Sequence, residues 1–196
     1  MPLTSLGVKK VGSNYSVDYD KENSTLSHEI AHQITDYAYY APGLRGWFTE
    51  GLAEYIAMSG YRSGKFNVDD LSKLRETVTA YGENNTGGRA LGDELNAPNL
   101  EDFFMQSYSS FTSNANFNYG LAALVVYYFF HMDGEKDAAR IKALLKATKA
   151  SFAEAQATNQ RPEFSFDPLL DGRTWDEMEE DITKAWRGRR IKINFN

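Results

Sequence analysis

Two stretches of the sequence decide the fold: His28-Glu29-Ile30-Ala31-His32 and Trp47-Phe48-Thr49-Glu50-Gly51-Leu52-Ala53-Glu54-Tyr55. On an α-helix the first stretch places two imidazoles one turn apart, about 40° from each other around the axis. Rings at that spacing reach one Zn²⁺, at about 2.0–2.1 Å from each nitrogen, without bending the helix. Glu29 lies about 60° further round than His32, where a carboxylate can contact a water held by the metal. The pattern needs a third ligand from elsewhere in the chain.

Two carboxylates in the second stretch, Glu50 and Glu54, are candidates for this third ligand. Both lie far enough beyond His32 for the first helix to end and a second to return antiparallel, so spacing alone does not choose between them. We expect Glu50 to be the ligand and Glu54 to accept the free N–H of a ligand histidine, which fixes that ring's tautomer. The alternative is that both are solvated helix charges. Gly51 has no Cβ and would let this helix approach a neighbour closely.

The rest of the chain favours helices, with extended segments at its two ends. Leu26, Ile30 and Ile34 lie opposite the histidines, so we expect the first helix to bury that face in the core. The pattern predicts a mostly helical α+β domain over residues 1–196, with a small N-terminal β-element beside the histidine helix. The predicted helices span residues 24–40, 47–58, 67–81, 100–105, 119–132, 136–149, 152–157 and 174–186; residues 3–19 and 191–195 are predicted to be extended; residues 84–98, 106–118 and 161–172 are predicted to be loops or irregular.

Composition limits the classes of function. The 196 residues carry a formal net charge of −6 with a pI near 5.1, which argues against a nucleic-acid-binding surface. The absence of cysteine excludes disulfides and thiolate metal sites. Residues 1–9 lack the apolar core of a signal peptide, and the longest apolar run, 121–130, is too short for a membrane span. We therefore expect no transmembrane helix, in a domain compatible with a longer, secreted or extracytoplasmic parent protein.

The two stretches resemble those of the gluzincin superfamily of zinc metallopeptidases, the thermolysin-like HExxH…E enzymes, and most closely short peptidase-MA-like domains of unknown function. The similarity extends over about residues 15–187 and includes Tyr119, Phe152-Ala153-Glu154-Ala155 and Trp186. The metzincin pattern is excluded, because it needs glycine and then histidine or aspartate where the chain has Thr35 and Ala38. Fuller gluzincins carry more sheet before the HExxH helix than this chain does.

The resemblance implies a zincin-like fold and one Zn²⁺ ion held by His28, His32 and Glu50. It also implies that Glu29 is the general base and that Glu54 supports a ligand histidine. A donor for the developing oxyanion is needed as well. Tyr119 and His131 are the candidates; they lie about 18 Å apart along one helix, so both cannot face the same metal.

Short relatives resemble this chain at Tyr119, which favours it as the oxyanion donor over the alternative of a core tyrosine with a satisfied hydroxyl. We expect His131 to be a surface histidine stabilised by a helix C-terminus, and Asp36 to be a helix-surface charge.

The implied activity is zinc-dependent hydrolysis of a peptide bond in a peptide or protein substrate. In this hypothesis the metal activates a water, and Glu29 moves its proton to the leaving nitrogen. The alternative is a zinc-bearing binding or scaffold module of a larger surface protein, without turnover. A zinc ion that only joins two helices is a third possibility, which leaves Glu29 without a role.

Overall fold

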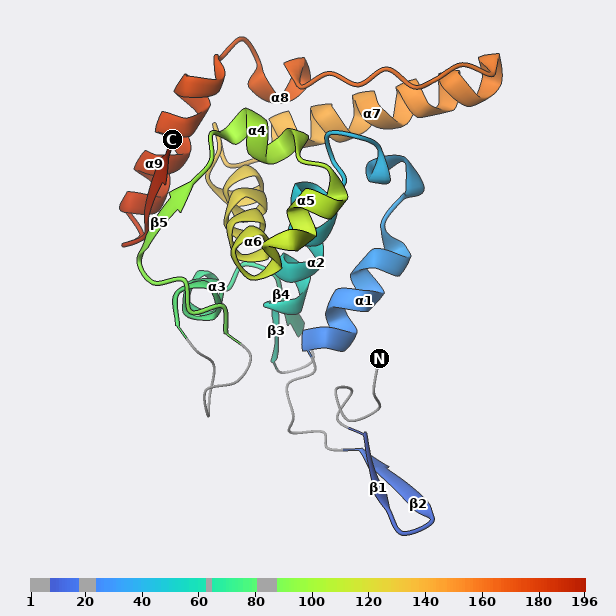
Figure 1. Ribbon diagram of the computed structural model, residues 1–196, viewed down its shortest axis with the longest axis vertical. Coiled ribbons are helices and arrows are strands. Elements are labelled where there is room, and N and C mark those ends of the chain that lie inside the picture. Colours follow the sequence, from blue (N-terminus) through green and yellow to red (C-terminus); the bar gives the residue numbers. More distant parts are fainter. Residues whose placement is uncertain (1–7, 18–23, 63–64, 81–87) are drawn as a thin grey trace.

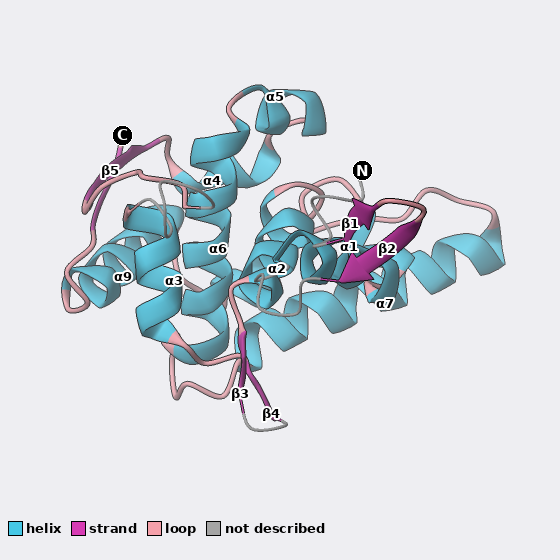
Figure 2. Ribbon diagram, turned by 90° about the horizontal axis from the view of Figure 1, so that it is seen from below, coloured by secondary structure: helices cyan, strands magenta, loops and turns pink. Residues whose placement is uncertain are grey.

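The computed structural model describes residues 8–17, 24–62, 65–80 and 88–196. Helices dominate and the strands are short and peripheral (Figure 2), which confirms the predicted mostly helical α+β class. The helices are α1 (Ser24–Ile34), the 3₁₀ helix η2 (Tyr37–Tyr40), α2 (Trp47–Ala57), α3 (Leu71–Thr79), α4 (Leu100–Met105), α5 (Tyr108–Ser113), α6 (Ala115–His131), α7 (Ala139–Thr158), α8 (Asp167–Leu170) and α9 (Trp175–Arg187). The described strands form three two-stranded sheets: β1 (Val8–Val11) with β2 (Asn14–Val17), β3 (Gly60–Arg62) with β4 (Lys65–Asn67), and β5 (Glu94–Ala97) with β6 (Lys192–Phe195).

The core is built around α6, which α2 contacts along its length. Every residue from 121 to 129 is buried, as expected for a helix that is apolar nearly all round. Gly51 is the point of closest approach, since a Cβ on it would lie 2.7 Å from the carbonyl oxygen of Ala122 and 2.8 Å from a methyl group of Val126. The absence of a side chain at Gly51 therefore allows α2 to lie against α6.

Replacing Gly51 by alanine should destabilise the protein, because the new Cβ would meet the backbone of α6, which cannot move cheaply. Overpacking of this kind costs about 1–3 kcal/mol, more than the roughly 1 kcal/mol that alanine gains over glycine within a helix. We expect the free energy of unfolding, measured in urea, to fall by up to about 2 kcal/mol. Gly188→Ala is the control, since a Cβ there meets nothing closer than 3.4 Å. Equal stability of the two variants would contradict this account of the α2–α6 contact.

The helix that carries the two histidines lies at the edge of the bundle and packs mainly against α2. The prediction that its apolar face is buried in the core is wrong: Leu26 is 40 % exposed, Ile30 49 % and Ile34 73 %. The amphipathic pattern was interpreted correctly as a helix, but its apolar face is exposed to solvent.

The first helix also ends earlier than predicted. It stops at Ile34, and the chain continues into the separate 3₁₀ helix η2 rather than as one helix to residue 40. The Asp36 side chain accepts a hydrogen bond from the Ala38 N–H, which starts η2, and its other oxygen lies 2.6 Å from Lys149 Nζ. Asp36 is therefore a capping residue with an ion-pair partner on α7 rather than a plain surface charge.

The predicted N-terminal β-element is present as the β1–β2 hairpin, with Val8 opposite Val17 and Val11 opposite Asn14. It extends away from the helical body in Figure 1, whereas the alternating pattern predicted a half-buried strand beside the histidine helix. Val11 and Tyr15 are each 63 % exposed. The predicted extension through residues 3–7 and 18–19 lies outside the described residues.

Several boundaries differ from the predictions for local reasons. The helix predicted over 67–81 begins only at Leu71, because the Asp70 side chain caps it and residue 67 ends β4. Residues 106–118 are not a loop but contain α5 and the start of α6, and 161–172 contain α8, with a proline in its first turn. The helices predicted over 136–149 and 152–157 are one helix, α7, since neither glycine nor proline interrupts them.

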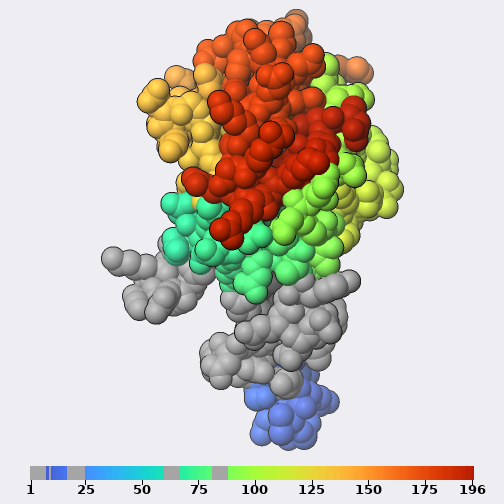
Figure 3. Space-filling model, turned by 90° about the vertical axis from the view of Figure 1, so that its left-hand side faces the viewer, coloured from blue at the N-terminus to red at the C-terminus, as the bar shows by residue number. Residues whose placement is uncertain are grey.

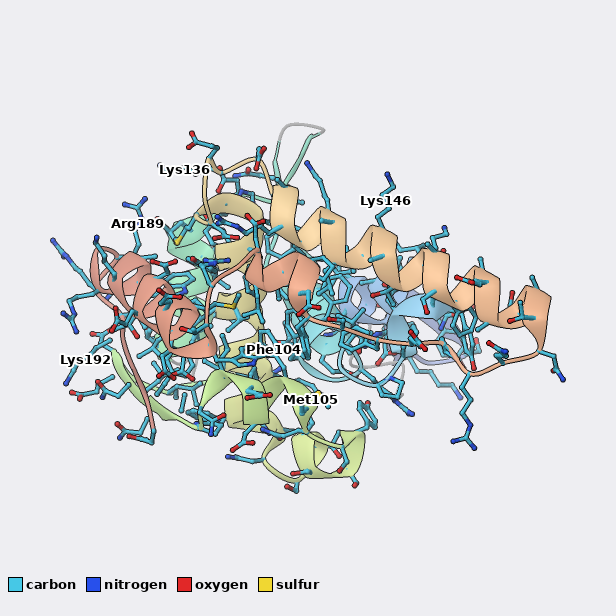
Figure 4. All side chains as sticks on the ribbon, turned by 90° about the horizontal axis from the view of Figure 1, so that it is seen from above. Phe104, Met105, Lys136, Lys146, Arg189 and Lys192 are labelled. Carbon is cyan, nitrogen blue, oxygen red and sulfur yellow. The ribbon has the colours of Figure 1, made fainter. Side chains whose placement is uncertain are left out.

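Two distant segments close the C-terminal side of the molecule. The predicted terminal strand is confirmed as β6, which pairs in parallel with β5, a strand in a segment predicted to be a loop. Figure 3 shows the red C-terminal segment lying against the green segment that contains β5. Next to β5, α4 directs Phe104 into the core and leaves Met105 exposed to solvent (Figure 4). The Phe104 ring stacks on Trp47 of α2, with the ring centroids 3.9 Å apart. These contacts fix the start of α2, from which Glu50 projects.

Candidate metal centre

Three potential ligand atoms converge where α1 meets α2. The Nε2 atoms of His28 and His32 lie 3.1 Å apart, and Glu50 Oε2 lies 3.4 Å from the first and 3.2 Å from the second. Two ligand atoms bound to a tetrahedral zinc ion at 2.0–2.1 Å are themselves about 3.3 Å apart. The triangle therefore has the dimensions of one face of a zinc coordination tetrahedron, and these three residues could hold a metal ion.

The two helices run antiparallel at this point. His28 contacts both Glu54 and Glu50, whereas His32, one turn later on α1, contacts Glu50. Both carboxylates are buried: Glu50 is 4 % exposed and Glu54 8 % exposed. They lie on a helix whose first turn is rich in aromatic residues. Burial of two carboxylates on one helix costs free energy unless each has partners of opposite charge or hydrogen-bond donors.

The hydrogen bonds of His28 direct its Nε2 towards the triangle. Its Nδ1 lies 3.0 Å from Glu54 Oε1, and a carboxylate there accepts the Nδ1–H and leaves Nε2 with a free lone pair. The other oxygen of Glu54 lies 2.7 Å from Arg89 Nη2. Arg89 thus neutralises the buried Glu54 and holds it against the ring.

His32 is oriented in the same way by a different group. The Tyr40 hydroxyl of η2 lies 3.2 Å from His32 Nδ1 and donates to the backbone carbonyl of His32 at 3.1 Å. Since the hydroxyl proton is used on the carbonyl, the phenolic oxygen is free to accept the Nδ1–H. When neutral, both rings are therefore held in the tautomer that turns an unprotonated Nε2 towards Glu50.

Glu50 divides its two oxygens between two tasks. Oε1 accepts a hydrogen bond from the Tyr108 hydroxyl of α5 at 2.9 Å, while Oε2 faces the two Nε2 atoms. The supporting contacts from Glu54, Tyr40 and Tyr108 thus fall on atoms outside the triangle. Three acceptor atoms this close to one another repel unless a cation or a proton lies among them, which is what a metal site requires.

The pKa values describe the same cluster when it holds protons. Burial alone would lower the pKa of His28, but hydrogen bonds to Glu50 and Glu54 outweigh it and raise the pKa to about 9. Burial would raise the pKa of Glu50, but hydrogen bonds to His28 and His32 hold it well below its usual range. Burial would likewise raise the pKa of Glu54, but hydrogen bonds to His28 and Arg89 outweigh this effect and keep the pKa low. Both carboxylates are therefore ionised at neutral pH.

Of the two predicted catalytic residues, Tyr119 lies beside the triangle. The ring of Tyr119, on α6, stacks on His28 with centroids 6.1 Å apart. Burial, the Glu50 charge and the neighbouring Tyr108 all raise the pKa of the Tyr119 hydroxyl, which therefore stays protonated and able to donate. Glu29 follows His28 on α1 and is exposed to solvent.

The third histidine belongs to a different cluster. His131 Nε2 lies 2.8 Å from the Tyr55 hydroxyl, and its Nδ1 lies 3.7 Å from Asp69, which also accepts a hydrogen bond from Tyr127. His131 is partly buried by these partners rather than a simple surface residue at a helix end. The structure does not bring it to the metal triangle.

The sequence interpretation did not find three residues that touch the cluster: Tyr40, Arg89 and Tyr108. Tyr40 was expected as the last residue of the first helix, and Tyr108 was expected in a loop. None of the three has a fixed spacing from the HExxH motif, so the only available signal was a hydroxyl or a guanidinium in the segments that flank the two helices.

Comparisons of the chain with models of known protein families, with curated proteins and with solved structures found no match. Of the helices that the structure describes, none combines the length and hydrophobicity that a membrane span needs. The chemistry of the cluster itself is therefore the basis for inferring function.

Metal binding should release a proton, because in the metal-free protein the pKa of His28, about 9, keeps its ring protonated at pH 7. A metal ligand must be unprotonated, so the apparent zinc affinity should rise by about one log unit per pH unit from near pH 7 up to pH 9 and then level off. Calorimetry at pH 7 in buffers of different ionisation enthalpy should show about one proton released per zinc.

In Glu54→Gln this release should shrink, because the variant loses a carboxylate that raises the His28 pKa. Zinc binding without proton release by the unaltered protein at pH 7 would contradict the proposed protonation of His28.

Proposed function

We propose that the chain is a zinc-dependent peptidase with a zincin-like arrangement of its metal-binding helices. The observation that carries the proposal is the triangle of His28 Nε2, His32 Nε2 and Glu50 Oε2, with edges of 3.1, 3.2 and 3.4 Å. Two histidines and one glutamate are the three-ligand set of thermolysin-type catalytic zinc sites, which leave the fourth position for water or substrate. The antiparallel α1–α2 pair that presents these ligands supports the zincin-like arrangement.

The chemistry divides between the ion and the side chains around it. When bound, Zn²⁺ supplies Lewis acidity, which polarises a carbonyl group and makes water more acidic. Glu29 takes the proton of the attacking water and returns it to the leaving nitrogen of the peptide bond. The Tyr119 hydroxyl, kept protonated by its raised pKa, donates a hydrogen bond to the carbonyl oxygen as negative charge develops there.

The supporting residues hold this arrangement in place. Glu54 and Arg89 fix the ring of His28, Tyr40 fixes the ring of His32, and Tyr108 fixes the carboxylate of Glu50. A structural zinc that only joins two helices would need a fourth protein ligand, and among the described residues only these three form such a cluster.

The proposal is tested by incubating the zinc-loaded protein with a diverse peptide library, with and without a chelator, and analysing the products by mass spectrometry. We expect new peptide termini that disappear with the chelator and return when zinc is restored. Cleavage that survives the chelator would point to a contaminating or metal-independent activity.

A second candidate function is a zinc-bearing binding module without turnover. The exposed apolar face of α1, formed by Leu26, Ile30 and Ile34, favours it, because such a patch on a ligand-bearing helix is typical of a surface that another protein covers. One equivalent of bound zinc with no chelator-sensitive cleavage in the library experiment would select this candidate over the peptidase.

A further inference from the structure

An arginine without a carboxylate partner among the described residues lies at the edge of the metal centre. Arg45, in the turn before α2, is exposed, and its guanidinium carbon lies 4.5 Å above the centre of the Tyr108 ring. The hydroxyl of the same tyrosine donates to Glu50 at 2.9 Å. One aromatic ring therefore separates the guanidinium from a metal ligand.

The stacking on Tyr108, whose hydroxyl contacts Glu50, places the guanidinium at the rim of the metal centre and not on a distant surface.

Four arginines elsewhere in the described part of the chain form ion pairs with carboxylates: Arg75 with Asp93, Arg89 with Glu54, and Arg140 and Arg173 with Asp133. Arg45 has no such partner among the described residues, in a chain with 27 acidic and 21 basic residues. Stacking on an aromatic ring uses the face of a guanidinium and leaves its N–H edges available. Those edges match a carboxylate, which they bind through two parallel hydrogen bonds.

We propose that Arg45 binds a carboxylate of the substrate, so that the site prefers peptides carrying a carboxylate one or two residues from the cleaved bond. An extended peptide advances about 3.4 Å per residue, and the guanidinium carbon lies 4.5 Å from the centre of a ring whose hydroxyl is 2.9 Å from Glu50, so one or two residues are needed between the two groups. The carboxylate is either the C-terminus of the peptide or the side chain of an aspartate or glutamate. The inference rests on the proposed peptidase function, since it names the substrate class of the same site.

The test measures binding first, so that it does not depend on turnover. Three N-terminally labelled hexa-alanine peptides are compared by fluorescence anisotropy: one with a free C-terminal carboxylate, one with a C-terminal amide, and one amide in which a single alanine is replaced by glutamate. The protein is the zinc-loaded Glu29→Gln variant, which retains the binding site without the proposed base. Hydrogen bonds to a charged group correspond to about 10- to 100-fold in affinity, so one or both carboxylate peptides should bind that much more tightly than the neutral amide.

In Glu29→Gln combined with Arg45→Gln, this preference should disappear, while affinity for the neutral amide changes by less than about threefold. Arg161→Gln, an exposed arginine between α7 and α8, is the matched control and should keep the preference. Arg45→Lys should restore only part of it, because lysine keeps the charge but cannot form the paired hydrogen bonds. The arm that loses affinity identifies the source of the carboxylate.

Two failures are distinguishable. Equal binding of all three peptides, or a preference that survives Arg45→Gln because the carboxylate binds elsewhere, overturns the role of Arg45 whatever the protein cleaves. An Arg45-dependent preference in a protein that shows no chelator-sensitive cleavage overturns the peptidase function and leaves the carboxylate site in place.

Discussion

Glu29→Gln should retain one zinc ion and lose peptide cleavage by about 10²- to 10⁴-fold, the usual contribution of a positioned general base. The amide has nearly the same shape as the carboxylate but cannot accept and return a proton. Glu29 is exposed on α1 and is not part of the triangle, so the substitution leaves the positions of His28, His32 and Glu50 unchanged. Elemental analysis gives the zinc content, and cleavage of the best library peptide gives the rate.

The matched control for this prediction is Glu76→Gln, the same substitution at an exposed position on α3. It should change neither zinc content nor rate. If the Glu29→Gln protein binds zinc and cleaves as fast as the unaltered protein, the mechanism is wrong and another group must move the proton.

Glu50→Ala should lose the metal more completely than any other single change on α2. It removes one of the three ligand atoms, Glu50 Oε2, and leaves the Tyr108 hydroxyl without its acceptor. Glu54→Ala removes only the group that orients His28, and loss of such support typically weakens zinc binding by about 10- to 100-fold. We expect Glu50→Ala to exceed that range, so that it contains no zinc after dialysis at a concentration that keeps Glu54→Ala partly loaded.

Circular dichroism serves as the control for both variants, because a large loss of helix would attribute the missing zinc to unfolding. The reverse order, with zinc retained in Glu50→Ala and lost in Glu54→Ala, would make Glu54 the ligand. The same result would also remove the geometric basis of the proposed peptidase, because the triangle would then be drawn from the wrong atoms.

The parts of the structure that were predictable from the sequence depend on short-range spacing. The antiparallel return that brings Glu50 to His32 follows from the separation of two motifs, and α9 begins where Thr174 and Glu177 form a capping box. Gly51 was identified as a point of close approach from its position beside Glu50, and the structure places it against α6. In each case the residues that determine the feature lie close together in the sequence, at most 18 positions apart.

The features that were missed depend on contacts between distant segments. The pairing of β5 with β6 joins residues about a hundred positions apart, and four-residue strands carry little periodicity of their own. The apolar pattern of Leu26, Ile30 and Ile34 indicates which side of α1 is hydrophobic but not whether another layer covers it. Arg89 and Tyr108 reach the centre from segments whose approach is set by the packing of the whole chain.

The marginal position of α1 has a consequence for how metal and fold depend on each other. Two of the three ligands lie on a helix that is joined to the body mainly through α2, and the third ligand is on α2 itself. A cation bound by all three ligands would link α1 to α2 across their interface. Chelation would then release α1 by local unfolding while the aromatic core around α6 stays folded, so the protein would lose its activity under conditions where most of the fold remains intact.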